Sequence, residues 1–205
     1  MLRRTSIKII NQKLKDNPHW NILDIGCGYT ANEHAKTVAD TQDLSNFYKD
    51  KKFIRIKEKK IPFKDNEFDF VIASHVIEHV VDLKFFIHEI ERISKKGYIE
   101  LPTRLGDNLV VENLNDHIWW FKYDDSLERL IVSKKNQVLE PFVNVSTAKK
   151  LESIFRESLV MELSWENKID YIIDSNLEMK RQPKISFIHL IKKYLSKKIR
   201  KFLLG

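Results

Sequence analysis

A short apolar run that ends in two closely spaced glycines constrains this chain more than any other feature. The run is Ile22-Leu23-Asp24-Ile25, and Gly26-Cys27-Gly28 follows it directly. The chain has only five glycines in 205 residues, whereas an average usage of about 7% would give about fourteen. Glycine is needed where the backbone turns sharply or where a ligand approaches the main chain. The pattern predicts a buried parallel strand that opens into a tight turn beside a ligand.

Strands and helices alternate around this turn. Beyond the first run, we expect strands at residues 37–40, 53–56, 68–73 and 98–101, and helices at residues 4–15 and 82–93. Apolar residues recur at helical spacing in both helical segments, and Pro or Gly follows each of them. The alternation predicts an α/β fold, a Rossmann-like doubly wound and mainly parallel sheet with helices on both faces. Ligands of such sheets bind at the carboxyl ends of the strands.

The second half of the chain has a different pattern. Bulky residues alternate with period two from His117 to Tyr123, and Asp124-Asp125 predicts a turn before the run at 127–132. This indicates a β-hairpin insertion at about residues 105–135. A helix is expected at 146–155 and a late strand at 168–173. We therefore predict a domain over residues 1–180, followed by a basic amphipathic C-terminal helix over 181–205.

The net charge of +7 comes from the C-terminal tail. Nine Lys and Arg residues follow Met179 without any Asp or Glu, which leaves 27 basic against 29 acidic residues before them. A slightly acidic body argues against a DNA- or RNA-binding face, because such faces oppose many basic side chains to phosphates. In the tail, one helical stripe is apolar and the other face is basic. Such a helix either binds an anionic membrane, here through 184–204, or packs on the body or on a second subunit.

The sequence also bears on the compartment. No apolar run approaches the roughly 18 residues that a membrane span needs, and Met1–Ile10 is too short for a secretory signal. Cys27 is the only cysteine, so no intrachain disulfide can form. We expect a cytoplasmic protein with peripheral contact at the inner membrane surface.

Two carboxylates flank the glycine turn. Asp40 ends the next strand, where it can accept hydrogen bonds from both hydroxyls of a ribose. With Ala31 three residues after Gly28, the spacing also fits a dinucleotide fingerprint. Asp24 argues against that reading, because it would repel a pyrophosphate, whereas S-adenosylmethionine presents an ammonium and a sulfonium there.

Four patterns follow one another along the chain, namely Ile22–Gly28, Ile61–Asp69, Val71–Val80 and Gly97–Pro102. In this order they resemble the motifs of the type 11 class I S-adenosylmethionine-dependent methyltransferases, and the resemblance covers about residues 20–103. It implies a methyltransferase fold and activity, with S-adenosylmethionine as the cofactor. Carried over by position, the cofactor-binding residues are Asp24, Gly26, Cys27 and Gly28 around the methionine part, Asp40 at the ribose, Glu58 near the adenine, and Ser74 and His75 at the sulfonium.

The chain departs from the family pattern in two places. Tyr29-Thr30-Ala31 replaces a further glycine of the loop, and the short gap to Asp40 leaves little room for a full first helix. Many family members also hold the adenine amino group with an Asp, where this chain has Lys57. These departures put the recognition of adenine in doubt.

Methyl transfer requires that the acceptor be positioned and its proton removed. His75 and His79 directly follow the fourth predicted strand, and we expect one of them to act as the catalytic base, the alternative being a structural hydrogen bond. His75-x-x-Glu78-His79, with His117, also resembles the Glu-x-x-Glu-His metal motif of small-RNA 2′-O-methyltransferases. Because Glu-His is common at this place in type 11 enzymes without a metal, we assign no metal.

The acceptor is the least constrained part of the function. The end of the fifth strand and the His-and-Trp hairpin resemble methyltransferases found among surface-glycan enzymes, so we expect O-methylation of a glycan or glycolipid intermediate. The hairpin aromatics either pack within the hairpin or form a wall for a sugar or base. Alternatives are an RNA 2′-O-methyltransferase, which a metal requirement would favour, and a non-catalytic binding module that has lost its donor. The oligomeric state stays open.

Overall fold

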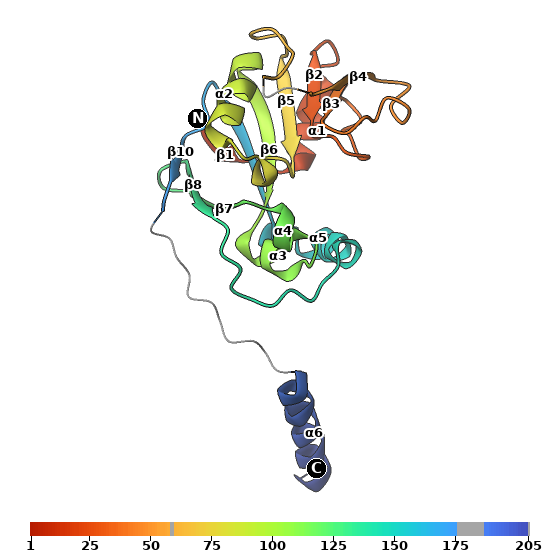
Figure 1. Ribbon diagram of the computed structural model, residues 1–205, viewed down its shortest axis with the longest axis vertical. Helices are drawn as coiled ribbons and strands as arrows, with labels where there is room; N and C mark the ends of the chain where they lie inside the picture. The colour runs from red at the N-terminus through yellow and green to blue at the C-terminus, as the bar shows by residue number, and fades with distance from the viewer. Residues whose placement is uncertain (58–59, 176–186, 205) are drawn as a thin grey trace.

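The computed structural model describes residues 1–57, 60–175 and 187–204 (Figure 1). Its main sheet has seven strands in the order β1-β9-β6-β5-β2-β3-β4, and among the strands described β9 alone runs opposite to the direction of the others. This topology confirms the predicted α/β fold with a mainly parallel sheet. The strands are β1 (Leu2–Arg4), β2 (Ile22–Ile25), β3 (Thr37–Asp40), β4 (Lys52–Arg55), β5 (Phe70–Ser74), β6 (Lys96–Pro102) and β9 (Val160–Glu166).

Helices cover both faces of the central strands. On one face, Ile10 and Leu14 of α1 (Ile7–Asp16) pack in a cluster with Ile22 and Tyr98. On the other, the apolar face of α2 (Leu83–Ile93) packs on the alternate residues of the same strands, which include Leu23, Val71 and Ile99. Successive side chains of a strand point to opposite faces, so strands buried on both sides read as continuous apolar runs.

Two strands of the main sheet were missed, and one expected strand is shorter than predicted and lies in a second sheet. Residues 2–4 form β1 rather than the start of the first helix, and β9 begins directly where α5 (Val145–Leu159) ends. No turn residue separates α5 from β9, so the pattern gave no boundary. The expected strand at 168–173 is the short β10 (Tyr171–Ile173), which pairs in parallel with β8 (Arg129–Lys134) outside the main sheet.

The predicted hairpin is confirmed and forms a second sheet with β10. Its strands are β7 (Trp119–Asp124) and β8 (Arg129–Lys134), in the order β10-β8-β7. Two short helices, α3 (Arg104–Leu109) and α4 (Asn113–Asp116), connect β6 to the hairpin. The hairpin aromatics serve its packing, because all of them are buried, namely Trp119, Trp120, Phe121 and Tyr123.

The C-terminal amphipathic helix is also present, as α6 (Phe187–Leu204). The predicted segment 181–205 therefore lies within the described residues only from 187 to 204. None of the described helices, α6 included, combines the length and the apolarity that crossing a membrane would require.

Gly97 in β6 leaves the space that the indole ring of Trp165, on the neighbouring strand β9, occupies. A Cβ at Gly97 would lie 2.0 Å from Trp165 Cη2, and Trp165 stands opposite it on β9. We expect Gly97→Ala to lower the free energy of unfolding by about 2–3 kcal/mol, because the buried ring has no room to move. Urea unfolding measures this loss. In a Trp165→Leu background the same substitution should cost less than about 1 kcal/mol, and an equal cost in both backgrounds would contradict the explanation.

Candidate functional site

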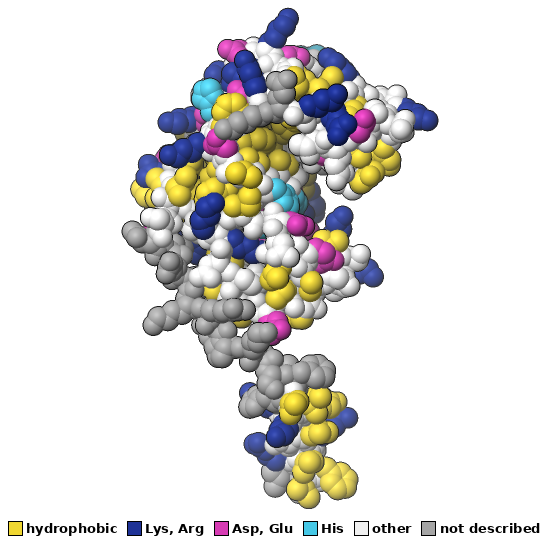
Figure 2. Space-filling model, viewed as in Figure 1, with side chains coloured by type: hydrophobic (Ala, Val, Ile, Leu, Met, Phe, Trp, Pro, Cys, Tyr) yellow, Lys and Arg dark blue, Asp and Glu magenta, His cyan; other side chains and the backbone are white. Residues whose placement is uncertain are grey.

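The candidate site residues singled out from the sequence lie together at one edge of the main sheet. The turn after β2, the end of β3 and residues 74–79 after β5 all lie at the carboxyl ends of parallel strands. Figure 2 shows the surface indented between the part built on β2–β4 and the part that holds α3–α5, and histidine side chains are exposed in the indentation. In open parallel sheets this edge is where ligands bind.

The two glycines of the turn have different roles. Both adopt positive φ, 68° at Gly26 and 48° at Gly28, a conformation that glycine adopts without strain. A Cβ at Gly26 would lie 2.4 Å from Val76 Cγ2, so this glycine is required for packing against the loop after β5. A Cβ at Gly28 would meet nothing within 4 Å. A ligand can therefore reach the main chain at Gly28.

The two carboxylates shape the same turn. Asp24 is buried, and its Oδ2 accepts a hydrogen bond of 2.7 Å from the Asn32 amide. Burial raises the pKa of Asp24 to about 7, although that hydrogen bond opposes the shift. Asp40 Oδ2 accepts from the Gly28 amide at 2.9 Å, and its Oδ1 accepts from the Gln42 amide at 2.9 Å. A carboxylate oxygen has two lone pairs, so Asp40 can still accept from a ligand hydroxyl.

The short connection between β2 and β3 contains turns in place of a helix, as the gap in the sequence indicated. Tyr48, which the sequence reasoning missed, braces it: its hydroxyl donates to the Gly28 carbonyl at 2.8 Å and accepts from the Ala31 amide at 3.0 Å. Cys27 is buried beside this ring, and burial raises the pKa of its thiol to about 12. Cys27 is therefore a neutral packing residue at physiological pH and shapes the turn without acting as a nucleophile.

His75 is held between two acidic side chains. It has a φ of 54°, rare for a residue other than glycine. Its Nδ1 lies 3.2 Å from Glu78 Oε1, and its Nε2 lies 3.1 Å from Glu100 Oε1. Burial lowers the pKa of His75, but the two carboxylates outweigh burial and raise it to about 10. A protonated imidazole has no free lone pair, so these surroundings favour a positioning role for His75 over that of a base.

Glu100 extends this cluster and was not singled out from the sequence. Its Oε2 accepts from Arg156 Nη2 at 2.5 Å and from the Tyr98 hydroxyl at 2.8 Å. Burial tends to raise the pKa of Glu100, but its partners, His75 first among them, lower it overall. The available signal was an acidic residue inside the apolar run of β6. The cluster fixes the chain after β5 against β6, next to half-buried Ser74.

His79 is more open than His75. It is exposed, and its Nδ1 lies 2.9 Å from the carbonyl oxygen of Asp116. A carbonyl only accepts, so Nδ1 carries the hydrogen and Nε2 keeps a lone pair. Glu78 and His79, in the 3-10 helix η1 (Ile77–His79), lie beside His117. The structure thus brings all four residues of the suspected metal motif to one edge, whereas Glu58 lies outside the described residues.

Residues 23–99 match the model of a protein family described as "Methyltransferase domain". An uncharacterised protein of Methanocaldococcus jannaschii is 34% identical over 122 residues, which cover 53% of this chain and 51% of the relative. The chain thus spans about half the length of this relative.

Two solved structures are similar at lower identity. A methyltransferase of Thermotoga maritima, described as a possible histamine N-methyltransferase, is 15% identical, with a TM-score of 0.44 over 77% of this chain and 87% of that one. An S-adenosylmethionine-dependent methyltransferase of Mesorhizobium loti is 12% identical, with a TM-score of 0.42 over 72% and 90%.

Proposed function

We propose that this chain, which carries a domain of the methyltransferase domain family in residues 23–99, transfers a methyl group to a hydroxyl of a glycan or glycolipid intermediate. The family match supports the predicted class I methyltransferase and its cofactor, S-adenosylmethionine. In this proposal residues 1–180 are the catalytic domain, and the helix after them is a membrane contact.

The observation that carries the proposal is the open main chain at Gly28 between two carboxylates. When bound, S-adenosylmethionine supplies a methyl group on a sulfonium, which is an electrophile without further activation. Asp24 would neutralise the ammonium of its methionine part, and Asp40 would accept from the ribose hydroxyls. Cys27 and Ser74 would line the pocket, and Glu58 is the remaining candidate near the adenine. The open space at Gly28 and the acidic turn fit a cationic donor.

The protein's remaining task is to align the acceptor oxygen and remove its proton. His79 suits this task, because its Nε2 lone pair is free and the residue lies on the exposed rim after β5. His75, held in place by Glu78 and Glu100, would position the loop that borders the sulfonium. The support for a glycan acceptor is the resemblance of β6 and the hairpin to surface-glycan methyltransferases.

The C-terminal helix supports a lipid-linked acceptor. Apolar side chains that are exposed in α6 form one stripe of the helix: Ile188, Ile191, Leu195, Ile199 and Phe202. Basic side chains cover the other face, among them Lys192, Lys193, Lys197 and Lys198. We propose that this helix lies on the anionic inner membrane surface, where the lipid-linked substrate would be.

Two measurements test the function. Isothermal titration of the full chain with S-adenosylhomocysteine should give saturable binding; correctly folded protein that gives no heat would instead be a binding module without its donor site. Transfer of a labelled methyl group should then be followed in cell extracts separated into glycolipid, polysaccharide and RNA. Label in the lipid or polysaccharide fraction supports the proposal, whereas label in RNA would replace it with RNA 2′-O-methylation.

His79 gives the most direct test of the chemistry. We expect His79→Gln to lower kcat by about 100-fold, the lower end of what a general base contributes. The affinity for S-adenosylhomocysteine should stay within about twofold, because His79 is not placed at the donor. His88→Gln, a change at an exposed histidine of α2, is the matched control. An unchanged rate in His79→Gln would remove this residue from the mechanism.

A further inference from the structure

We propose that Glu78, His79 and His117 form a binding site for one divalent transition-metal ion at the rim of the candidate active site. One ligand atom from each of the three residues lies within 4.8 Å of those of the other two. Glu78 and His79 belong to η1, whereas His117 directly precedes β7. The cluster is therefore created by the fold, since η1 and the hairpin are far apart in the sequence.

Hydrogen bonds hold these two segments together. The Ile118 amide donates to the Glu78 carbonyl at 2.8 Å, and Trp119 Nε1 donates to the Val80 carbonyl at 2.7 Å. The rings of His79 and His117 lie perpendicular to each other, with centroids 4.5 Å apart. The three side chains are therefore positioned before any ion binds.

Glu78 supplies an independent sign of a missing partner. Its side chain is completely buried, and one oxygen, Oε1, faces His75. The other oxygen, Oε2, has no hydrogen-bond partner among the described residues. Leaving a buried carboxylate oxygen unsatisfied is costly, and such atoms in folded proteins usually have a water or an ion beside them. A cation bound by Oε2 would remove that cost.

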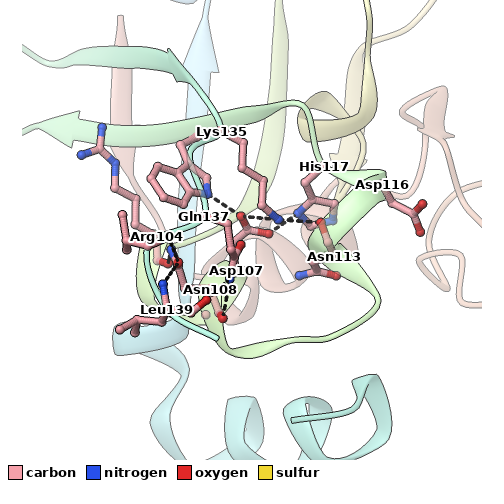
Figure 3. Close-up of polar contacts among 12 residues, drawn as sticks. Arg104, Asp107, Asn108, Asn113, Asp116, His117, Lys135, Gln137 and Leu139 are labelled. Atoms are coloured by element: carbon pink, nitrogen blue, oxygen red, sulfur yellow. Dashed lines mark hydrogen bonds and ion pairs between the residues drawn. The ribbon is translucent and has the colours of Figure 1, made fainter. Parts of the chain in front are cut away.

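Both histidines present the lone pair that a metal needs. His79 Nδ1 is engaged by the Asp116 carbonyl, which leaves Nε2 free. His117 Nδ1 lies 2.5 Å from Asp107 Oδ1, a close contact whose angles do not meet those of a hydrogen bond, and the other oxygen of Asp107 lies 3.0 Å from Lys135 Nζ. Figure 3 shows the side chains of His117, Asp107 and Lys135 pointing toward one another. A carboxylate or carbonyl behind the distal nitrogen is the usual support of a metal-binding histidine.

The ligand types select the ion. Two imidazole nitrogens and one carboxylate oxygen form a set that suits Zn²⁺ and neighbouring first-row ions such as Mn²⁺ or Co²⁺. With ligands about 2.1 Å from a tetrahedral ion, the ligand atoms stand about 3.4 Å apart, so the separations, which are at most 4.8 Å, must shorten by up to about 1.4 Å. His79 can supply most of this movement because it is exposed. A tetrahedral ion held by these three side chains would keep one position for a further ligand.

The consequence for catalysis rests on the proposed function. An ion at this place would hold the acceptor oxygen in its open position and lower the pKa of the hydroxyl. Because His79 Nε2 would then bind the ion, the proton of the acidified hydroxyl would pass to solvent water, and not to His79. His79→Gln should lose activity whether His79 is a base or a metal ligand. Metal binding must therefore be measured directly.

The test uses Co²⁺ as a spectroscopic probe on the full, tag-free chain after treatment with EDTA. We expect one equivalent of Co²⁺ to give visible d–d absorption, which Zn²⁺ then displaces. His79→Ala and Glu78→Gln should each weaken Co²⁺ binding by more than about 100-fold, because they remove a ligand. His88→Ala, which removes a histidine outside the cluster, should bind like the unchanged chain. Circular dichroism verifies that each variant is folded.

Two results would overturn the proposal: no Co²⁺ absorption with the unchanged chain, or equal Co²⁺ binding by His79→Ala, Glu78→Gln and the unchanged chain. Because His79 is exposed, its variant should fold even if the Glu78 variant does not. Titration of the same samples with S-adenosylhomocysteine separates this outcome from the function itself. Donor binding without Co²⁺ binding would refute the metal site and leave the methyltransferase proposal standing.

Discussion

Asp24→Asn should weaken binding of S-adenosylhomocysteine by about 1000-fold at pH 8. A carboxylate about 4 Å from an ammonium, at an effective dielectric constant of about 20, contributes about 4 kcal/mol, which corresponds to about three decades in affinity. Asparagine can still accept the hydrogen bond from the Asn32 amide, so the turn should keep its shape. Isothermal titration measures the change. Asp43→Asn, which neutralises an exposed acid just after β3, is the matched control.

At pH 8, Asp24→Asn should also raise the free energy of unfolding, although it lowers the affinity for S-adenosylhomocysteine. Because the folded-state pKa of Asp24 is raised to about 7, its contribution to stability is present at acid pH and lost as pH rises from about 4 to 7. At pH 8 the buried charge is a cost that Asp24→Asn removes, on the order of 2–4 kcal/mol. Urea unfolding of both chains at pH 5 and pH 8 measures this gain, which should be clearly larger at pH 8 than at pH 5.

The pH dependence of donor binding follows from the same carboxyl group. In the unchanged chain, affinity for S-adenosylhomocysteine should fall as pH drops below about 7, because the protonated acid no longer attracts the ammonium. Asp24→Asn should bind equally weakly at pH 6 and pH 8. Affinities of Asp24→Asn and the unchanged chain that agree within threefold at pH 8 would place the ammonium elsewhere.

Elements with a local signal could be predicted from the sequence. β2 and β3 were predicted at their observed bounds, and α2 begins one residue after its capping residue, Asp82. Each of them combines a dense apolar pattern with a clear stop or cap. β1 and β9 lack such signals: β1 has three residues, and β9 follows a helix without a turn. Their pairing joins the two ends of the domain, which no local pattern encodes.

The candidate site also has a part that the sequence predicts and a part that depends on the folded structure. The turn from Asp24 to Gly28 is one continuous segment, so its residue types and spacing were sufficient to locate it. The partners of Glu100 could not be located in this way. Arg156 is 56 residues away from Glu100 and reaches it only after β9 pairs with β6. His75 and His79 looked equivalent in sequence. They differ because His75 meets two carboxylates while His79 meets a carbonyl oxygen, a distinction that depends on the folded loop.

Replacing four lysines of α6 by glutamine should weaken binding to anionic vesicles by about 1000-fold. Each basic residue near an anionic surface contributes about 1 kcal/mol, and four of them about three decades in partition. The residues are Lys192, Lys193, Lys197 and Lys198, all exposed. Sedimentation with vesicles of phosphatidylglycerol and phosphatidylcholine measures the change over a range of lipid concentrations. The attraction should also weaken at high salt, which screens surface charges.

The control must separate the position of the charges from their number. A second variant with the same net charge replaces four exposed lysines of the body, namely Lys8, Lys15, Lys49 and Lys84. It should bind vesicles like the unchanged chain, because only α6 joins its basic face to an exposed apolar stripe. Equal binding by both variants would show general electrostatic attraction. If none of the chains binds and sedimentation velocity shows a dimer that Ile191→Ser dissociates, the stripe serves a second subunit and the membrane proposal is wrong.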